Sequence, residues 1–424
     1  MSGNSFFDRT VEWLKVNRFK ILLHVLTIVL SFVLLFVGNK AVYDKETVFL
    51  GGYEDGAVTA TVTEILLESK EPNYIGDEFV GEDITVVFDC KITKGDMKGQ
   101  TVTAYERISA HDPISIEVVE KGDRILLVES LEEDFSWCLY DFDRSVPLWV
   151  LGFIFVALIL IFGRKKGINT LISLGYTCAA VFLVFVPSVL SEKNIYLWSI
   201  LVCIYIIAMT LTITEGYSKK TLAAVIGCTS GVVVAGVLTV VFSRILNMSG
   251  ATGDDTINII MNFDIDLNAL IFAGIVLGAV GAVMDVSVSI SSSLKEIHDN
   301  VENPTFGLLV KSGMNIGRDI MGTMANTLVL AYIGCELSAT LLQVMYSSSM
   351  TTLFSREKIV AELLQALVGS IGILLTIPLT AVVSAALYTG GKKSKKPPKE
   401  KKQKYDKYYV EPSDEPSLFE RIDK

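Results

Sequence analysis

The chain has 424 residues, of which 51% are hydrophobic and 20% charged, with a formal charge of −10 and a mean hydropathy of +0.48. This mean is too apolar for an ordinary water-soluble globular chain, so enzyme folds that need polar surfaces on every side are excluded for most of its length. The composition predicts an α-helical polytopic membrane protein.

Long uncharged stretches place the membrane spans. Five of them lack Asp, Glu, Lys and Arg and approach the roughly 20 residues that cross a bilayer: 21–39, 145–163, 167–191, 194–214 and 221–243. Three further spans are expected at about 267–292, 320–346 and 359–388, the first two containing Asp285 and Glu336. The sequence therefore predicts about eight transmembrane helices.

The basic residues predict the orientation. Lys and Arg occur in the N-terminal segment and then in alternate connections, as expected when these segments are cytoplasmic: 164–167, 215–220, 294–319 and the C-terminal tail. We expect a plasma-membrane protein with both termini cytoplasmic. Its predicted parts are a cytoplasmic N-terminus (1–20), a transmembrane anchor (21–39), an extracytoplasmic domain (40–145), a seven-helix membrane domain (146–390) and a cytoplasmic polybasic tail (391–424). The first span is either an uncleaved anchor, which we favour, or a signal peptide, although no small-x-small cleavage site follows it.

The segment 40–145 is predicted to be a small β-rich domain. It holds 24 acidic against 10 basic residues. Short β-rich runs punctuated by glycines suggest a five-stranded barrel or sandwich: 57–67, 83–92, 101–108, 114–119 and 124–131. An OB-like barrel is one form of this fold, but the negative charge and the lack of a basic groove argue against nucleic-acid binding.

The polybasic tail carries nine lysines between residues 391 and 410, against Glu400 and Asp406. Directly after a span, such a cluster is expected to lie on anionic lipid head groups. The plainer alternative is a solvated topology anchor without a regulatory role.

Motifs for catalysis or for metal and cofactor binding were not found. The three histidines are far apart in sequence, and Walker-type, GxSxG and HExxH patterns are absent. Cys90 and Cys138 are the only cysteines of the exterior segment and form the candidate disulfide, because that side of the membrane is oxidising. We expect no enzyme activity, no metal and no cofactor.

Two polar stripes are the candidate functional residues. In the sixth span Gly278, Gly281, Asp285, Ser289 and Ser292 recur at helical spacing, and a carboxylate in hydrocarbon is costly enough that Asp285 is expected to face the protein interior. In the seventh, a second set follows the same periodicity: Asn315, Arg318, Asp319, Thr323 and Asn326. Antiparallel packing of the two helices predicts an ion pair or a shared polar cavity between Asp285 and Arg318.

Three sequence blocks resemble the YibE/F family of bacterial multi-pass membrane proteins. They are EGYSKKTLAA from Glu215, GAVGAVMDVSVSISSSLKEI from Gly278 and GMNIGRDIMGTMANTLVLAYIG from Gly313. The resemblance implies a bacterial plasma membrane and an anchor followed by an exterior domain, but no substrate. Glu336 departs from the small uncharged residue expected beside Gly334 and Cys335.

Two functions remain open. The first is a secondary permease or channel-like protein, in which the polar stripes bind an ion or a small polar solute. The second is a non-transporting scaffold or receptor whose exterior domain binds an envelope protein or peptide. In the second case, the stripes only fix the packing of two helices.

Overall fold

The computed structural model describes residues 4–42, 57–75, 78–109, 118–130, 136–252 and 265–390, with a few single residues between 253 and 264. Side chains of the first helix are described from Leu22 onward. The polybasic tail, and with it the predicted lipid contact, lies outside the described residues. The chain divides into two compact units, 1–216 with 249–273 and 217–248 with 274–424.

Apolar helices dominate the described chain. Six are long and apolar enough to cross a bilayer: 22–42 of α1 (Asn4–Val42), the segment Ser145–Leu190, α4 (Ile195–Glu215), α5 (Lys219–Ile245), α7 (Leu267–Asn300) and α11 (Glu357–Thr389). A seventh crossing results if α8 (Phe306–Cys335) and α9 (Leu337–Met345), bent by 69°, count as one span. A short helix, α10 (Met350–Phe354), connects α9 to α11.

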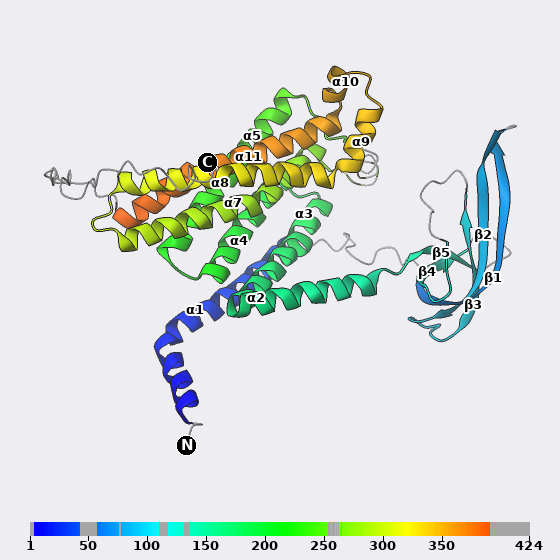
Figure 1. Ribbon diagram of the computed structural model, residues 1–424, viewed down its shortest axis with the longest axis horizontal. Coiled ribbons are helices and arrows are strands. Elements are labelled where there is room, and N and C mark those ends of the chain that lie inside the picture. Colours follow the sequence, from blue (N-terminus) through cyan, green and yellow to red (C-terminus); the bar gives the residue numbers. More distant parts are fainter. Residues whose placement is uncertain are drawn as a thin grey trace, which may run out of the picture. The chain divides into compact units, whose positions relative to one another are not determined.

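The segment Ser145–Leu190 folds back on itself. It comprises α2 (Ser145–Ala180), the π-helical turn η1 (Val181–Phe185) and α3 (Val186–Leu190). At 46 residues, a straight helix would be about 70 Å long, more than twice the hydrocarbon thickness. Arg164 breaks it with a φ of 48°, and a Cβ at Gly167 would overlap the carbonyl oxygen of Ile159. Residues eight apart touch in this way only where a helix reverses, as Figure 1 shows for the return toward α3.

In the first unit, α1 is bonded to its neighbours by polar groups. Tyr176 donates a hydrogen bond from its hydroxyl to the carbonyl of Ile28 (2.9 Å), and the hydroxyls of Ser31 and Tyr205 lie 2.9 Å apart. Ser191 donates to the carbonyl of Val42 (2.8 Å). Because a polar group without a partner is costly in hydrocarbon, these bonds fix the position of α1. The helix is a packed member of the bundle as well as an anchor.

The segment between α1 and α2 forms a closed five-stranded barrel. Its strands β1 (Val58–Ile75), β2 (Glu78–Ile92), β3 (Thr101–Ile108), β4 (Arg124–Glu129) and β5 (Trp137–Phe142) follow the order β1-β2-β3-β5-β4, with only β3 and β5 parallel. Alternate side chains fill its interior, among them Phe88, Ile125, Leu127 and Trp137. This strand order, with β3 and β5 parallel, is that of an OB-like barrel.

Two predictions for the barrel were wrong. The fifth strand is Trp137–Phe142, whereas Val118 and Val119 lie outside any strand and 114–117 lie outside the described residues. The expected disulfide is not formed, because Cys90 lies on β2 and Cys138 on β5, with β3 between them. Two strand spacings amount to about 9.5 Å, beyond the Cα separation of about 7 Å that a disulfide tolerates. Burial raises the pKa of the Cys90 thiol to about 11, and Asp89 adds to this effect.

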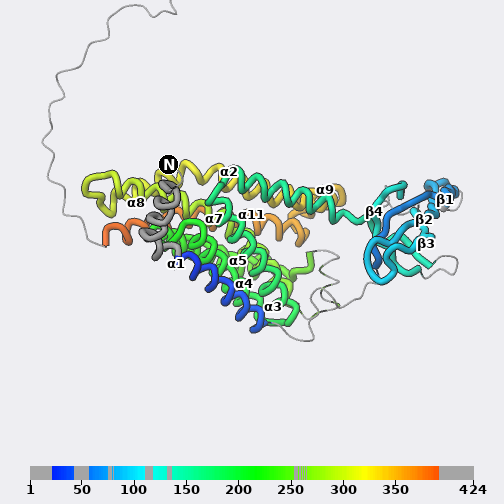
Figure 2. The backbone as a smooth tube through the Cα atoms, turned by 90° about the horizontal axis from the view of Figure 1, so that it is seen from below, coloured from blue at the N-terminus to red at the C-terminus, as the bar shows by residue number. Residues whose placement is uncertain are grey.

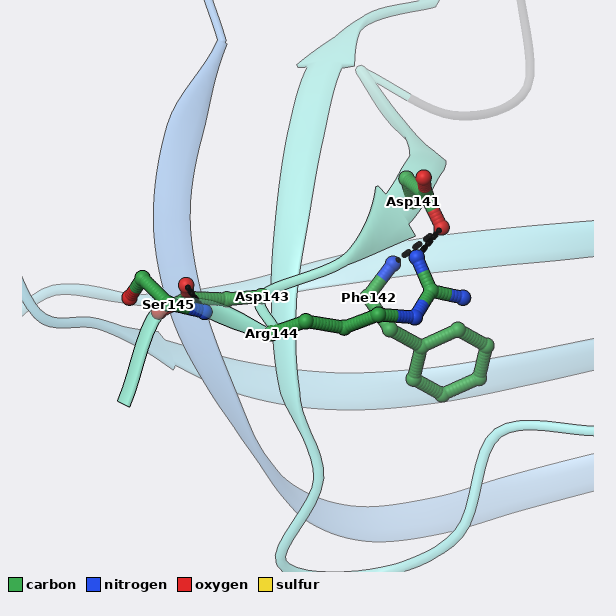
Figure 3. Close-up of polar contacts among 5 residues, drawn as sticks. All are labelled: Asp141, Phe142, Asp143, Arg144 and Ser145. Atoms are coloured by element: carbon green, nitrogen blue, oxygen red, sulfur yellow. Dashed lines mark hydrogen bonds and ion pairs between the residues drawn. The ribbon is translucent and has the colours of Figure 1, made fainter. Parts of the chain in front are cut away.

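Polar contacts define the junction where the chain leaves β5 for α2 (Figure 3). The carboxylate of Asp143 accepts a hydrogen bond from the N–H of Ser145 at 3.0 Å and pairs with Arg124 at 3.2 Å. Arg144 pairs with Asp141 at 2.8 Å and lies over the ring of Phe142. Hydrogen bonds from Ser145 lower the pKa of Asp143, and the N–H of Phe142 lowers that of Asp141. These charges mark the end of the barrel before the apolar helix begins.

Glu106 is a buried carboxyl in the barrel wall, 8% exposed, and it accepts a hydrogen bond from the N–H of Val119 at 3.0 Å. Burial raises its pKa above the ordinary 4.5, only partly offset by this hydrogen bond. The folded barrel therefore holds this proton more tightly than the unfolded chain does. The contribution of Glu106 to stability is accordingly lost as the pH rises from 4.5 through the raised pKa.

We expect Glu106→Gln to stabilise the barrel at pH 7 and to flatten this part of its pH dependence, since glutamine retains an acceptor without a charge. Glu106→Ala should destabilise it by about 1–3 kcal/mol, because the N–H of Val119 loses its partner. Denaturant unfolding of the full-length protein, followed through Trp137 with the other tryptophans replaced by phenylalanine, measures both. A Glu106→Gln variant less stable than wild type at pH 7 would contradict this account.

In the second unit α11 packs against α5 and α8 through very small residues. A Cβ at Gly227 or Gly231 of α5 would overlap Thr380 or Thr376 of α11, and one at Gly317 of α8 would overlap Ile377. Such contacts let the helix backbones approach closely, which is how membrane helices gain packing energy. All three glycines lie at buried positions.

The turn between α7 and α8 is shorter than predicted. The segment 294–319, expected to be a cytoplasmic connection, is helical except for residues 301–305. Thr305 caps α8 by accepting a hydrogen bond from the N–H of Leu308 at 3.2 Å. Asp285 and Arg318 consequently lie in the middle of long helices, and α8 continues with a bend into α9 (Figures 1 and 2).

Candidate functional site

The polar run of α7 is divided between two faces of the helix. Ser287 and Ser291 are fully buried, and Thr380 of α11 donates a hydrogen bond to the hydroxyl of Ser287 at 3.3 Å. Asp285 and Ser289 lie on the opposite, exposed face, and Ser292 is half-buried at its margin. The expectation that Asp285 faces the interior of its own bundle was wrong, because smaller hydroxyls occupy that face.

The predicted residues of α8 also lie on an exposed face. Asn315, Arg318, Asp319, Thr323 and Asn326 are exposed, whereas Gly313, Gly317 and Leu328 are buried on the other side of the helix. Thr323 directs its hydroxyl to the carbonyl of Ile320, at 2.9 Å. The arrangement leaves the charged groups of α8 free to contact whatever covers this face.

Two contacts give the register of α7 and α8. Leu294 packs over Gly313 near the turn, and the hydroxyl of Tyr332 lies over Gly278 at the far ends of the helices. Counting equal steps from these contacts places Asp285 level with 322–325 and Arg318 level with 289–292. The two stripes therefore run alongside each other over the same depth.

This register separates Asp285 and Arg318 by four to seven residues, which is about one to two helical turns or roughly 6–10 Å along the axis. In the part of the chain that the structure describes, no ion pair joins them, so the predicted pair is not formed. Arg318 instead lies level with the serines of α7, and Asp285 is level with the small residue Gly322. We call the polar residues of both stripes, all exposed except the half-buried Ser292, the polar face, namely Asp285, Ser289, Ser292, Asn315, Arg318, Asp319, Thr323 and Asn326.

A second polar group, at the bend between α8 and α9, was not identified as a site from the sequence. Glu336 pairs with Lys358 at 3.5 Å, and Glu362 of α11 lies close enough to feel both charges. Glu336 itself was noted only as an unusual residue beside Gly334. Lys358 and Glu362 lie on α11, which follows α9 and α10 in the chain. Only the fold shows that they are neighbours of Glu336. The ion pair ties the bend to the start of α11.

Among the residues that the structure describes, no group of three or more His, Cys, Asp or Glu side chains is placed to hold a metal ion. The polar face offers carboxylates, hydroxyls, amides and one guanidinium. These groups can bind a hydrated cation, exchange a proton or hydrogen-bond a small polar solute.

Long apolar helices packed through glycine contacts define a multi-pass helical membrane protein. Residues 151–390 match the family model described as YibE/F-like protein. The chain belongs to this family, as its three sequence blocks predicted. No curated protein and no solved structure gave a match.

Proposed function

We propose that this YibE/F-like protein is a secondary permease or channel-like protein for an ion or a small polar solute. The observation that carries the proposal is the polar face, where Asp285, Arg318 and Asp319 are exposed at the middle of two apolar helices. Charged groups at this depth normally line a water-filled path or contact other protein groups rather than lipid. A path with both signs of charge and several hydroxyls suits a hydrated or polar solute. The protein acts without catalysing a covalent reaction.

The proposed topology has eight crossings, with both termini cytoplasmic and residues 40–145 outside the cytoplasm. The reversal at Arg164 supports it, because each half of Ser145–Leu190 is then long enough for one crossing. With α8 and α9 as one bent span, this division raises the number to eight. The polar bonds of α1 support retention of that helix in the mature protein.

Flux into proteoliposomes tests the proposal directly. Purified protein should carry protons, alkali cations or small polar solutes faster than protein-free vesicles across a panel of these compounds. A signal for at least one class is expected. A panel without any flux above the protein-free control would favour the scaffold.

Cysteine accessibility distinguishes the two functions without knowledge of the solute. In a background without native cysteines, Ser289→Cys should react with a membrane-impermeant thiol reagent, because a permeation path is wet. Ser291→Cys is the matched control two residues away and should stay unreactive, since Ser291 is fully buried. Equal protection of both positions would mean that the polar face is dry, as in a scaffold.

A further inference from the structure

The hairpin of β1 and β2 extends far beyond the rest of the barrel (Figure 1). β1 has 18 residues and β2 has 15, against 8, 6 and 6 in the other strands. β4 pairs only with 58–61 of β1, and β3 pairs only with 84–91 of β2. Among the described residues, the distal part from Glu71 to Asp83 is thus a two-stranded ribbon without a third strand. A ribbon of this kind is marginally stable by itself in water.

Apolar side chains are exposed along this hairpin. Leu66 and Leu67 are 50% and 58% exposed, and Tyr74 and Phe79 near its end are 57% and 55% exposed. The two aromatic rings pack edge to face, with their centroids 5.7 Å apart. This pair holds the strands together and still presents apolar surface to a partner. Aromatic side chains so placed are typical anchors of protein interfaces.

The same hairpin is strongly acidic. Residues 64–83 contain seven acidic side chains and one lysine, Lys70, which is already paired with Glu68 at 3.1 Å. The charge repels a second copy of the ribbon and anionic lipid head groups alike. Pro72 and the carboxylates of β1 also protect its edge against the addition of another strand. The acidic surface is complementary to a cationic partner that binds to the side chains of the hairpin rather than to its edge. Complementary charges of this kind steer the encounter and select the partner.

We propose that the β1–β2 hairpin is a docking arm for a cationic polypeptide outside the cytoplasm. Its carboxylates, among them Glu68, Glu71 and Glu82, bind lysine or arginine side chains, while Leu67, Tyr74 and Phe79 supply the apolar contact. The inference rests on the proposed extracytoplasmic position of the barrel. It does not depend on transport through the polar face, and absence of flux leaves it standing.

The test measures binding of a defined probe to the full-length protein in nanodiscs of uncharged lipid. The probe is a fluorescent peptide of about twelve residues in which lysines alternate with leucine, tyrosine and glycine; a version with glutamate for lysine is the negative control. Fluorescence anisotropy at low and high salt gives the Kd. Binding of the lysine peptide that weakens with salt is expected.

Matched variants locate the binding site. Glu68→Gln/Glu71→Gln/Glu82→Gln should raise the Kd about tenfold or more. The control Asp96→Asn/Glu120→Gln/Glu129→Gln removes three exposed carboxylates elsewhere on the barrel and should raise it less than about twofold, although both triples change the net charge equally. Tyr74→Ser/Phe79→Ser should weaken binding about threefold or more without changing its salt dependence.

Equal weakening by the two triple variants would overturn the proposal, because it would show attraction to the overall charge alone. Unchanged binding in Tyr74→Ser/Phe79→Ser would show that the two aromatic side chains do not contact the peptide, and the apolar part of the proposal would be wrong. If the protein forms a dimer through this hairpin in the absence of peptide, the partner of the hairpin is a second copy of the chain and not a cationic polypeptide. Trp137 fluorescence confirms in each variant that the barrel is folded.

Discussion

Asp285→Asn is expected to reduce flux at least about tenfold while leaving the protein folded. Asparagine has nearly the same shape as aspartate but neither carries a charge nor exchanges a proton at neutral pH. The attraction between a carboxylate and a cation at about 4 Å is of the order of 4 kcal/mol at the effective dielectric constant of a protein surface. Even partial hydration of the path leaves enough of this energy for a tenfold effect, which corresponds to about 1.4 kcal/mol.

The matched control is Glu296→Gln, an exposed carboxylate on the same helix, about three turns from Asp285 and beyond Ser292, the last residue of the polar face on α7. It should keep more than about half of the wild-type flux. Initial rates in proteoliposomes of equal protein content, together with the thermal unfolding midpoint of each variant, make the comparison. If Asp285→Asn retains the wild-type flux, this carboxylate is not part of the pathway.

Gly231→Ala is expected to destabilise the second unit by about 1–3 kcal/mol, an unusually large effect for a single added methyl group. The added Cβ would overlap the hydroxyl of Thr376, which is fully buried and donates a hydrogen bond to the carbonyl of Gly372 at 2.8 Å. Threonine is stiff at χ1, so relief requires α5 and α11 to separate. Lower yield of monodisperse protein and a lower unfolding midpoint should follow.

Gly281→Ala is the control, because this exposed glycine of α7 has no atom within 4 Å of the added Cβ. It should leave stability unchanged or raise it by up to about 1 kcal/mol through better helix propensity. Thr376→Ala should partly rescue Gly231→Ala, since it removes the overlapping oxygen. Independent, additive effects of the two substitutions would show that this contact does not limit the packing.

The helical part of the fold followed from local properties of the chain. Uncharged stretches of bilayer length predicted the apolar helices, and the reversal at Arg164 lies where the charges of 164–166 interrupt them. The segment 294–319 was expected to be cytoplasmic, and the structure shows that it is helical except for residues 301–305, with Arg318 and Asp319 on one side of a long helix. Composition does not distinguish a polar loop from the polar side of a helix.

The helical periodicity of the polar stripes was predicted correctly, but the side of the helix that faces the bundle was not. Ser287 and Asp285 are two residues apart, and either could have faced the bundle; Thr380 of α11 decides which one does. The partners of Glu336 likewise come from a separate connection. The strand Trp137–Phe142 was missed because its alternation is weak, and it is held by pairing with β3 and β4.

By itself, the sequence determined the class of protein, its family, most of its helices, the β-rich segment near the N-terminus and the residues of the two stripes. These are properties of apolar length, charge and short-range periodicity, which act along the chain. The tertiary structure alone decided the register of α7 and α8, the separation of Asp285 from Arg318, the distance between Cys90 and Cys138 and the exposed acidic hairpin. These depend on which distant segments come into contact, and close packing allows only those contacts in which a glycine or a small hydroxyl leaves enough room.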